Sequence, residues 1–320
     1  MDSPLINVKN LRVSFFTKLG EVKAVDGLSY EIQKGKTLGI VGESGCGKSV
    51  ASYAILGLLS YPGRIVGGEI LFKGEDISRY TREQYENLRG NQITMVFQEA
   101  LTALNPVLTI GYQITEQIER HLSYSHKQAI HRAVELMDLV GIPSPGKRLA
   151  EYPHQLSGGM KQRAMIAMAL SCNPDLFIAD EPTTALDVTI QAQILDLVQS
   201  LQERLHMTVQ YITHDLGVVS ELADDIIVMY AGRIVESGPN QAIFNNPRHP
   251  YTKGLLASIP MFKKRVDKLY TIPGMVPSPL ELPPGCAFCN RCPTSREQCR
   301  HQQPDLVSLN GADHKVACFY

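Results

Sequence analysis

The sequence predicts an α/β fold, in which helices cover a parallel sheet, with a smaller antiparallel sheet and a Cys-rich C-terminal extension. Continuous apolar runs at 37–41, 176–179 and 209–213 are typical of parallel strands buried on both faces. Alternating apolar and polar residues over 5–32 indicate antiparallel strands with one wet face. Five of the seven Cys lie in the last 35 residues.

Length and charge narrow the class of protein. The 320 residues suggest about two domains. Lys and Arg number 31 against 32 Asp and Glu, so no net field would attract nucleic acid or anionic lipid. The start lacks a basic and apolar leader, and no run of 18 apolar residues occurs, which predicts a cytosolic chain.

The order of the patterns predicts a domain over residues 1–245 and an extension over 246–320. Within the domain, the strand signal disappears between about 99 and 170, which indicates a helical insert. The predicted insert helices are Gly111–Leu122, Lys127–Val140 and Gly158–Leu170. Repeated prolines in the extension limit its core, so it needs another means of stabilisation.

A phosphate-binding loop follows the first apolar run. Gly42-Glu43-Ser44-Gly45-Cys46-Gly47-Lys48-Ser49 fits G-x-x-x-x-G-K-[ST] and precedes a helical pattern at Val50–Leu59. Backbone N–H groups and the helix N-terminus would bind phosphate, Lys48 would reach the β- and γ-phosphates, and Ser49 would coordinate Mg²⁺. The predicted nucleotide contacts from this segment are Gly42, Ser44, Gly45, Cys46, Gly47, Lys48, Ser49 and Val50.

Two further strands end in polar residues. Asp180 and Glu181 follow the apolar run 176–179, at the strand end where open α/β sheets bind ligands. We expect Asp180 to hold Mg²⁺ and Glu181 to polarise the water that attacks the γ-phosphorus. His214 follows another strand and could contact the γ-phosphate. Taken alone, the acids could instead cap a helix, and the histidine could be structural.

The segment Leu156-Ser157-Gly158-Gly159-Met160 resembles the signature motif of ATP-binding cassette (ABC) proteins, and the motif order over 5–245 is similar to that family. The resemblance implies a P-loop NTPase (RecA-like) core that hydrolyses ATP with Mg²⁺. It also implies roles for single residues. Gln98 matches the Q-loop, which contacts Mg²⁺ and the reaction site; Asp187 ends the D-loop; His214 matches the switch histidine; Phe15, beside Phe16, matches the aromatic that stacks on adenine.

The signature implies a partner ATPase. Ser157, Gly158 and Gly159 would open a helix and form a second anion site, apart from Lys48. In the family, two ATPases pair head to tail, and each ATP lies between the phosphate loop of one and the signature of the other. ATP then closes the pair, and hydrolysis releases it.

Other segments are similar to the dipeptide and oligopeptide (peptide/nickel) importers. They are 96–106, 152–160, 228–232, 249–256 and, in the extension, Gly285-Cys286 and Arg291-Cys292-Pro293. The resemblance implies a D-type ATPase subunit, peripheral on the cytoplasmic membrane face, paired with a second and usually non-identical ATPase, although a homodimer is possible. Two membrane-spanning permease subunits and, indirectly, an extracytoplasmic solute-binding protein would be its partners, and nucleic acid would not.

Three alternatives stay open. The transporter could import nickel or another solute. The chain could be a soluble ABC ATPase of DNA repair or translation, which the single cassette and balanced charge disfavour. It could also be an iron–sulfur redox module that the cassette regulates.

The cysteine spacing C-x2-C-x2-C-x6-C-x18-C suggests a metal site, because thiolates suit iron–sulfur clusters and Zn²⁺. The family resemblance implies a [4Fe-4S] cluster on Cys286, Cys292, Cys299 and Cys318, with Cys289 as a spare or substitute ligand. Zn²⁺ is the alternative metal, and five unrelated buried thiols are the alternative without metal.

Overall fold

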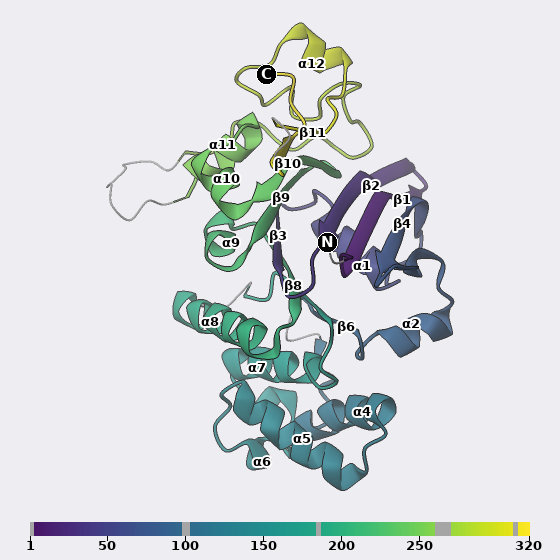
Figure 1. Ribbon diagram of the computed structural model, residues 1–320, viewed down its shortest axis with the longest axis vertical. Coiled ribbons are helices and arrows are strands. Elements are labelled where there is room, and N and C mark those ends of the chain that lie inside the picture. Colours follow the sequence, from purple (N-terminus) through teal and green to yellow (C-terminus); the bar gives the residue numbers. More distant parts are fainter. Residues whose placement is uncertain (1–2, 98–102, 184–186, 260–269, 310–312) are drawn as a thin grey trace. The chain divides into compact units, whose positions relative to one another are not determined.

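The computed structural model describes residues 3–97, 103–183, 187–259, 270–309 and 313–320 (Figure 1). The chain divides into two units. The first contains Met1–Gln33, Thr37–Arg79 and Ile212–Tyr320, and the second contains Lys34–Lys36 and Tyr80–Tyr211. No helix in the described ranges is both long and apolar enough to cross a bilayer.

An antiparallel sheet forms the N-terminal part of the first unit. Its strand order is β2-β1-β4-β5, followed by a short 3₁₀ helix η1. The elements are β1 (Ile6–Thr17), β2 (Gly20–Ile32), β4 (Gly63–Phe72), β5 (Glu75–Asp76) and η1 (Ile77–Arg79). Buried apolar residues of β1 and β2 largely alternate with more exposed polar ones, so one face of the sheet packs inward. The predicted antiparallel sheet is therefore confirmed.

Parallel strands form the centre of the same unit. β3 (Thr37–Val41) pairs in parallel with β9 (Asp225–Tyr230), and β10 (Arg233–Pro239) pairs antiparallel with β9. All residues of β3 are buried, as its continuous apolar run predicted. The helices of this part are α1 (Lys48–Ile55), α9 (Leu216–Leu222) and α10 (Asn240–Asn245). α1 ends earlier than the predicted helix 50–59 because Gly57 adopts a left-handed conformation, with φ 60°.

The C-terminal segment packs on this centre through an aromatic cluster. It comprises α11 (Pro250–Ala257), α12 (Glu297–His301), β11 (Val307–Ser308) and β12 (Lys315–Val316), and β12 pairs with both β10 and β11. Phe288, 2% exposed, lies with its ring centroid 5.2 Å from that of Tyr230 and 5.4 Å from that of Tyr251. These buried rings give the segment an apolar core.

A buried carboxylate anchors the same segment. Glu236 on β10 is fully buried and accepts hydrogen bonds from the N–H groups of Arg248 and His249, at 2.7 and 2.9 Å. Nε2 of His314 lies 2.7 Å from Oε1 of Glu236, the oxygen that also accepts the Arg248 N–H. Because a buried carboxylate is costly unless it is hydrogen-bonded, these contacts fix the start of α11 and the chain end against β10.

The second unit is mostly helical. β6 (Ile93–Val96) and β7 (Leu176–Asp180) pair in parallel, and β8 (Thr208–Thr213) carries the chain into the first unit. Its helices are α2 (Arg82–Leu88), α4 (Ile110–Leu122), α5 (His126–Leu139), α6 (Pro145–Arg148), η2 (Pro153–Gln155), α7 (Gly158–Ala169) and α8 (Val188–Leu205). The three helices predicted between 111 and 170 match α4, α5 and α7 within one residue at each end. Thr109, Ser125 and Ser157 stand at their N-caps and explain where they begin.

His249 makes the stability of the first unit depend on pH. Burial lowers its pKa to about 4, and its Nδ1 accepts the Tyr251 N–H at 3.1 Å. The unfolded chain, with a histidine pKa of about 6.5, binds the proton more tightly, so stability present above pH 6.5 is lost as the pH falls toward 4. We expect a loss of about 2 kcal/mol between pH 7.5 and pH 5 from this group.

Urea unfolding followed by circular dichroism at the two pH values measures this loss. His249→Asn keeps a capping acceptor and should reduce the pH dependence by about that amount. His131→Asn, at an exposed position, is the control. Equal pH dependence in all three proteins would contradict the prediction.

Candidate nucleotide site

The loop between β3 and α1 is held by close backbone packing. A side chain at Gly42 would place Cβ 2.3 Å from the Met229 carbonyl oxygen, and one at Gly47 would place it 2.3 Å from that of Ala24. Gly47 also has φ 100°, a conformation that favours glycine. The glycines therefore let the loop wrap tightly between β2 and β9.

Lys48 is fixed inside this loop. It is 5% exposed, and its Nζ donates to the carbonyl oxygens of Gly42 and Glu43 at 2.7 and 3.1 Å. It opens α1, so the ammonium and the positive end of the helix act on the same loop. The loop has the features that a phosphate-binding site requires.

The other predicted loop residues surround Lys48. Ser44 and Gly45 are exposed, Ser49 and Val50 are half-buried in the first turn of α1, and Cys46 is buried beneath the loop. Burial raises the pKa of the Cys46 thiol, which therefore stays neutral 3.9 Å from Nζ of Lys48. Such a thiol contributes packing and no charge.

The two neighbouring aromatic residues on β1 differ in exposure. Phe15 is half-buried, and its ring lies so close to Gly63 that a Cβ there would be 2.5 Å from Cε1. Phe16 is 40% exposed, and Arg64 lies over its ring at 4.2 Å from the centroid. Phe15 stays the predicted adenine contact.

Glu43, the second residue of the loop, has partners that the sequence did not predict. Its backbone N–H donates to the Tyr251 hydroxyl at 2.9 Å, and Arg291 binds its carboxylate. Tyr251 and Arg291 are more than 200 residues away in sequence. The loop motif contains no signal for such distant partners.

The second unit contains the predicted carboxylates. Asp180 ends β7 and is 1% exposed, and Glu181 follows with φ 45°. A left-handed glutamate is uncommon, and such backbone strain is typical of functional sites.

The predicted signature residues lie at a helix start, also in the second unit. Ser157 accepts the Met160 N–H at 3.4 Å and caps α7, which begins at Gly158 and Gly159 as predicted. Asp187 caps α8 in the same way, by accepting the Ile190 N–H at 2.9 Å.

His214 lies in the first unit, at an exposed position between β8 and α9. Gln98 lies outside the described residues. The structure thus brings the loop, Phe15 and His214 into one unit, whereas Asp180, Glu181, Ser157 and Asp187 belong to the other. The nucleotide and Mg²⁺ roles of all these residues stay predictions.

The predicted metal site of the C-terminal segment is wrong. Within the described ranges, no three or more His, Cys, Asp or Glu side chains are grouped so that they could hold a metal ion. The five thiols line a cavity of about 20 Å³, which has room for about one water molecule and not for an inorganic cluster. The residues concerned are Cys286, Cys289, Cys292, Cys299 and Cys318, predicted as [4Fe-4S] or, alternatively, Zn²⁺ ligands.

Burial affects the protonation of three of these thiols. Burial raises the pKa of Cys286 to about 11 and also raises the pKa of Cys289 and Cys318. The cysteine spacing suggested that a metal stabilises the segment. An aromatic cluster around Phe288 stabilises it instead, and because the residues of that cluster are far apart in the chain, no local sequence pattern reveals it.

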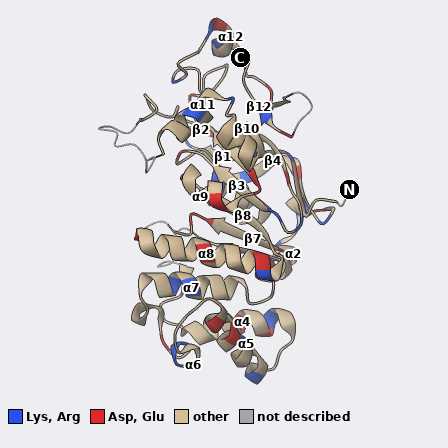
Figure 2. Ribbon diagram, turned by 60° about the vertical axis from the view of Figure 1, so that its left-hand side comes forward, with Lys and Arg blue, Asp and Glu red and all other residues tan. Residues whose placement is uncertain are grey.

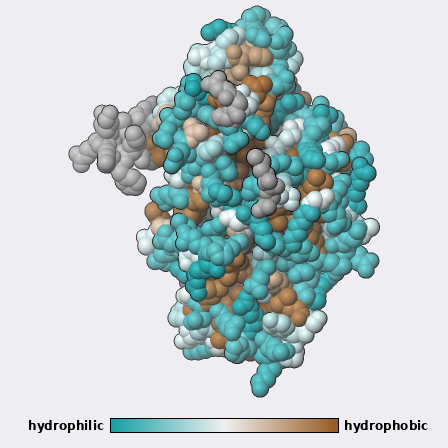
Figure 3. All heavy atoms as spheres, in the orientation of Figure 1, coloured by the Kyte–Doolittle hydropathy of each residue, from teal (hydrophilic) through white to brown (hydrophobic). Residues whose placement is uncertain are grey.

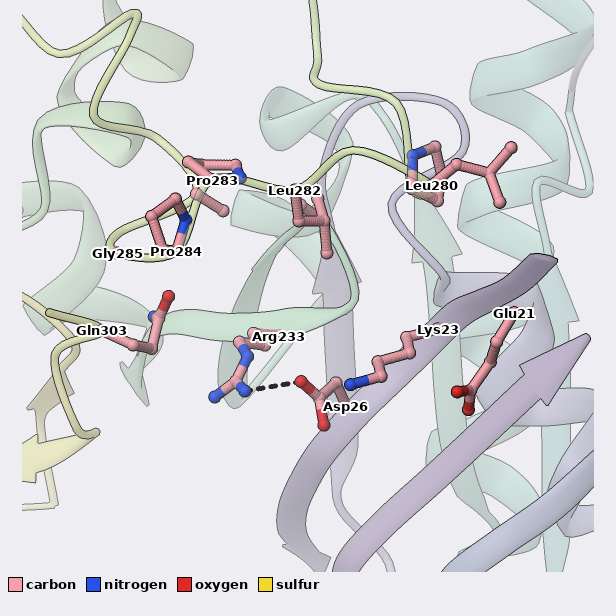
Figure 4. A pocket seen from close by; sticks show the side chains of 13 residues that line it. Glu21, Lys23, Asp26, Arg233, Leu280, Leu282, Pro283, Pro284, Gly285 and Gln303 are labelled. Atoms are coloured by element: carbon pink, nitrogen blue, oxygen red, sulfur yellow. Dashed lines mark hydrogen bonds and ion pairs between the residues drawn. The ribbon is translucent and has the colours of Figure 1, made fainter. Parts of the chain in front are cut away.

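A groove of about 330 Å³ lies where residues 279–285 cross β2 (Figure 4). Its charged wall contains Glu21 and Lys23, and Arg233 paired with Asp26 at 2.5 Å. Its other wall is formed by Leu280, Leu282, Pro283 and Pro284. The residues of the phosphate loop do not line this groove.

Charges of both signs are interspersed along the helices and strands (Figure 2). Several are paired locally, such as Arg148 with Glu151 at 2.8 Å and Arg82 with Glu86 at 2.9 Å. Such pairing compensates part of the charge locally within the described ranges.

Comparison with known families adds two matches. Residues 25–184 match the model of the ABC transporter family, and residues 235–299 match the oligopeptide/dipeptide transporter C-terminal region.

Similar proteins and structures agree with these matches. The oligopeptide transport ATP-binding protein AppD of Bacillus subtilis (strain 168) is 51% identical over 99% of this chain and 97% of its own length. The dipeptide transport ATP-binding protein DppD of Escherichia coli (strain K12) is 49% identical, over 95% and 93%. Among solved structures, the dimeric ATP-binding cassette MJ0796 bound to ADP and Pi has a TM-score of 0.65 at 27% identity, over 73% of this chain and 98% of its own. The cbiO1 protein of Clostridium perfringens, part of the ABC transporter complex cbiONQ, has the same TM-score and identity, over 77% and 92%.

Removing the Lys48 ammonium tests the site. We expect Lys48→Ala to weaken binding of MgATP at least about 10-fold and to lower its hydrolysis at least about 100-fold, because the loop loses its fixed cation. Titration calorimetry and phosphate release measure the two effects. Lys34→Ala, which removes an exposed lysine, should change neither. Parental hydrolysis by Lys48→Ala would show that the loop is not the site.

Proposed function

Because this chain belongs to the ABC transporter family of ATPases, we propose that it powers the import of dipeptides or oligopeptides by hydrolysing ATP. The observation that carries the peptide assignment is the match of residues 235–299 to the C-terminal region of oligopeptide/dipeptide transporters. The named transport roles of AppD and DppD support it, since each is similar over more than 90% of this chain.

The chain's own residues account for nucleotide binding. Lys48, held by two loop carbonyls, uses its remaining hydrogen-bonding capacity on phosphate oxygens, and backbone N–H groups at the start of α1 bind the others. The predicted Mg²⁺ residues, Ser49 and Asp180, are of the oxygen-ligand type that this cation prefers, and the ion would neutralise phosphate charge. Glu181 holds and polarises the attacking water, while His214 orients it.

Hydrolysis in this proposal requires two ATPase subunits. The capped start of α7 is a second anion-binding element, distinct from the loop before α1. In the proposed pair, the Ser157 to Gly159 segment of one subunit faces the nucleotide on the phosphate loop of the other. The partner is a second, non-identical ATPase in our proposal, and a homodimer is its alternative.

The second unit offers a surface for the membrane-spanning permeases that an ABC peptide importer requires. Hydrophobic side chains reach its surface among hydrophilic ones (Figure 3). Val107 is 76% exposed, Tyr112 54% and Tyr152 39%. The Gly111 N–H donates to the Leu149 carbonyl oxygen at 2.8 Å, so the start of α4 lies beside the segment that leads to Tyr152. We infer that two permeases dock here and hold the subunit at the cytoplasmic membrane face, with a solute-binding protein acting from outside.

Reconstitution tests the function. The chain, purified from membranes with its attached subunits, should carry a second ATPase and two permeases, identifiable by mass spectrometry. In proteoliposomes, dipeptides or oligopeptides presented with the solute-binding protein should stimulate hydrolysis and accumulate inside. Stimulation by nickel and not by peptide would reject peptide import while retaining the ATPase.

Glu181→Gln tests the hydrolytic role. The amide cannot polarise the water, so we expect turnover at least about 100-fold lower, with MgATP affinity within about 3-fold of the parent. ATP should then trap a closed ATPase pair, detectable by sedimentation. Glu203→Gln, at an exposed position on α8, is the matched control. If the Glu181 variant hydrolysed ATP at the parental rate, another residue would have to polarise the attacking water.

A further inference from the structure

We propose that Arg291, in the C-terminal segment, is a positioning residue for ATP binding: it holds and neutralises the Glu43 carboxylate so that the phosphate loop keeps its binding geometry. The residue lies outside the ATPase motifs and is separated from Glu43 by 248 positions in sequence.

The contact is a two-point ion pair. Nη1 of Arg291 lies 2.6 Å from one Glu43 carboxylate oxygen, and Nη2 lies 2.9 Å from the other. This fork geometry fixes both the position and the orientation of a carboxylate, which a single contact cannot do. The pair therefore restrains the second residue of the loop.

The guanidinium is itself held in place. Its Nε donates to the Pro273 carbonyl oxygen at 3.0 Å, and Nη1 donates to the Tyr230 hydroxyl at 3.3 Å. The side chain is only 5% exposed, whereas that of Glu43 is 29% exposed. Because the guanidinium is buried and makes several hydrogen bonds, it holds the Glu43 carboxylate rigidly. Its buried charge would be costly without the carboxylate that it faces.

The main chain of Glu43 is restrained as well. Its N–H donates to the Tyr251 hydroxyl, and its carbonyl oxygen accepts from Nζ of Lys48 at 3.1 Å. Burial and the Glu43 carboxylate raise the pKa of Tyr251, so its hydroxyl stays neutral and available. Glu43 thus connects the C-terminal segment directly to the lysine that binds phosphate.

Charge gives the pair a second effect. A carboxylate on the loop repels the anionic phosphates of ATP unless a cation compensates it. Arg291 supplies that cation and directs the carboxylate toward the C-terminal segment. Its loss would both loosen the loop and leave an uncompensated negative charge on it.

Calorimetric titration of the full chain with MgATP tests the proposal. We expect Arg291→Gln to raise the dissociation constant about 5- to 20-fold. The double variant Glu43→Gln/Arg291→Gln has no unpaired carboxylate, so its dissociation constant should return to within about 3-fold of the parent. If Arg291 served only the folding of the C-terminal segment, the double variant would instead bind MgATP at least as weakly as the single one.

Two control variants show whether weaker MgATP binding follows from the loss of any arginine or only from the loss of Arg291. Arg296→Gln removes a cation of the same segment, which lies over the Tyr320 ring at 3.8 Å. Arg148→Gln removes another arginine–carboxylate pair, in which Nη1 donates to both carboxylate oxygens of Glu151, at 2.8 and 2.9 Å. Both should bind MgATP with parental affinity.

Should Arg291→Gln not fold, Arg291→Lys provides the measurement, since it keeps the charge but loses the fork. We expect binding about 2- to 5-fold weaker, with an unchanged unfolding temperature. Parental affinity in Arg291→Lys or in Arg291→Gln, or a double variant no tighter than Arg291→Gln, would overturn the proposal.

Discussion

Close backbone packing around the phosphate loop is the constraint on which the rest of the first unit depends. The Cys46 carbonyl oxygen accepts the Gly232 N–H at 2.9 Å, and the Gly232 carbonyl oxygen accepts the Asp26 N–H at the same distance. Three chain segments therefore meet backbone to backbone, with glycine where a Cβ would collide. Because interiors tolerate little displacement, this packing sets the position of Lys48 before any ligand binds.

The C-terminal segment shares in that constraint through contacts of different physical kinds. Aromatic rings around Phe288 exclude water, Glu236 binds two backbone N–H groups at the start of α11, and Arg291 reaches the loop through Glu43. Each contact joins the segment to a strand or loop of the first unit. The segment is thus part of the structure that shapes the site, and it is stabilised by apolar and ionic contacts within the described residues.

Sequence patterns predicted the features that depend on residues close together in the chain. The loop glycines, the capping Ser157 and the buried run of β3 each carry their signal within a few residues, and the structure follows them. The partners of Glu43 could not be predicted, because Tyr251 and Arg291 reach it only through the fold. The cysteine spacing misled for a related reason: spacing defines which thiols can converge, whereas the packing of Phe288 and its neighbours defines the space between them.

The ion pair also explains how an acidic residue can be accommodated in a loop that we propose to bind phosphate. Glu43 would oppose phosphate binding in an isolated loop, yet its carbonyl oxygen helps to hold Lys48, and its carboxylate is compensated by Arg291. The combination makes the charge of the loop depend on a folded C-terminal segment. Unfolding of that segment would therefore weaken nucleotide binding even with every loop residue intact, which couples the integrity of the segment to the use of ATP.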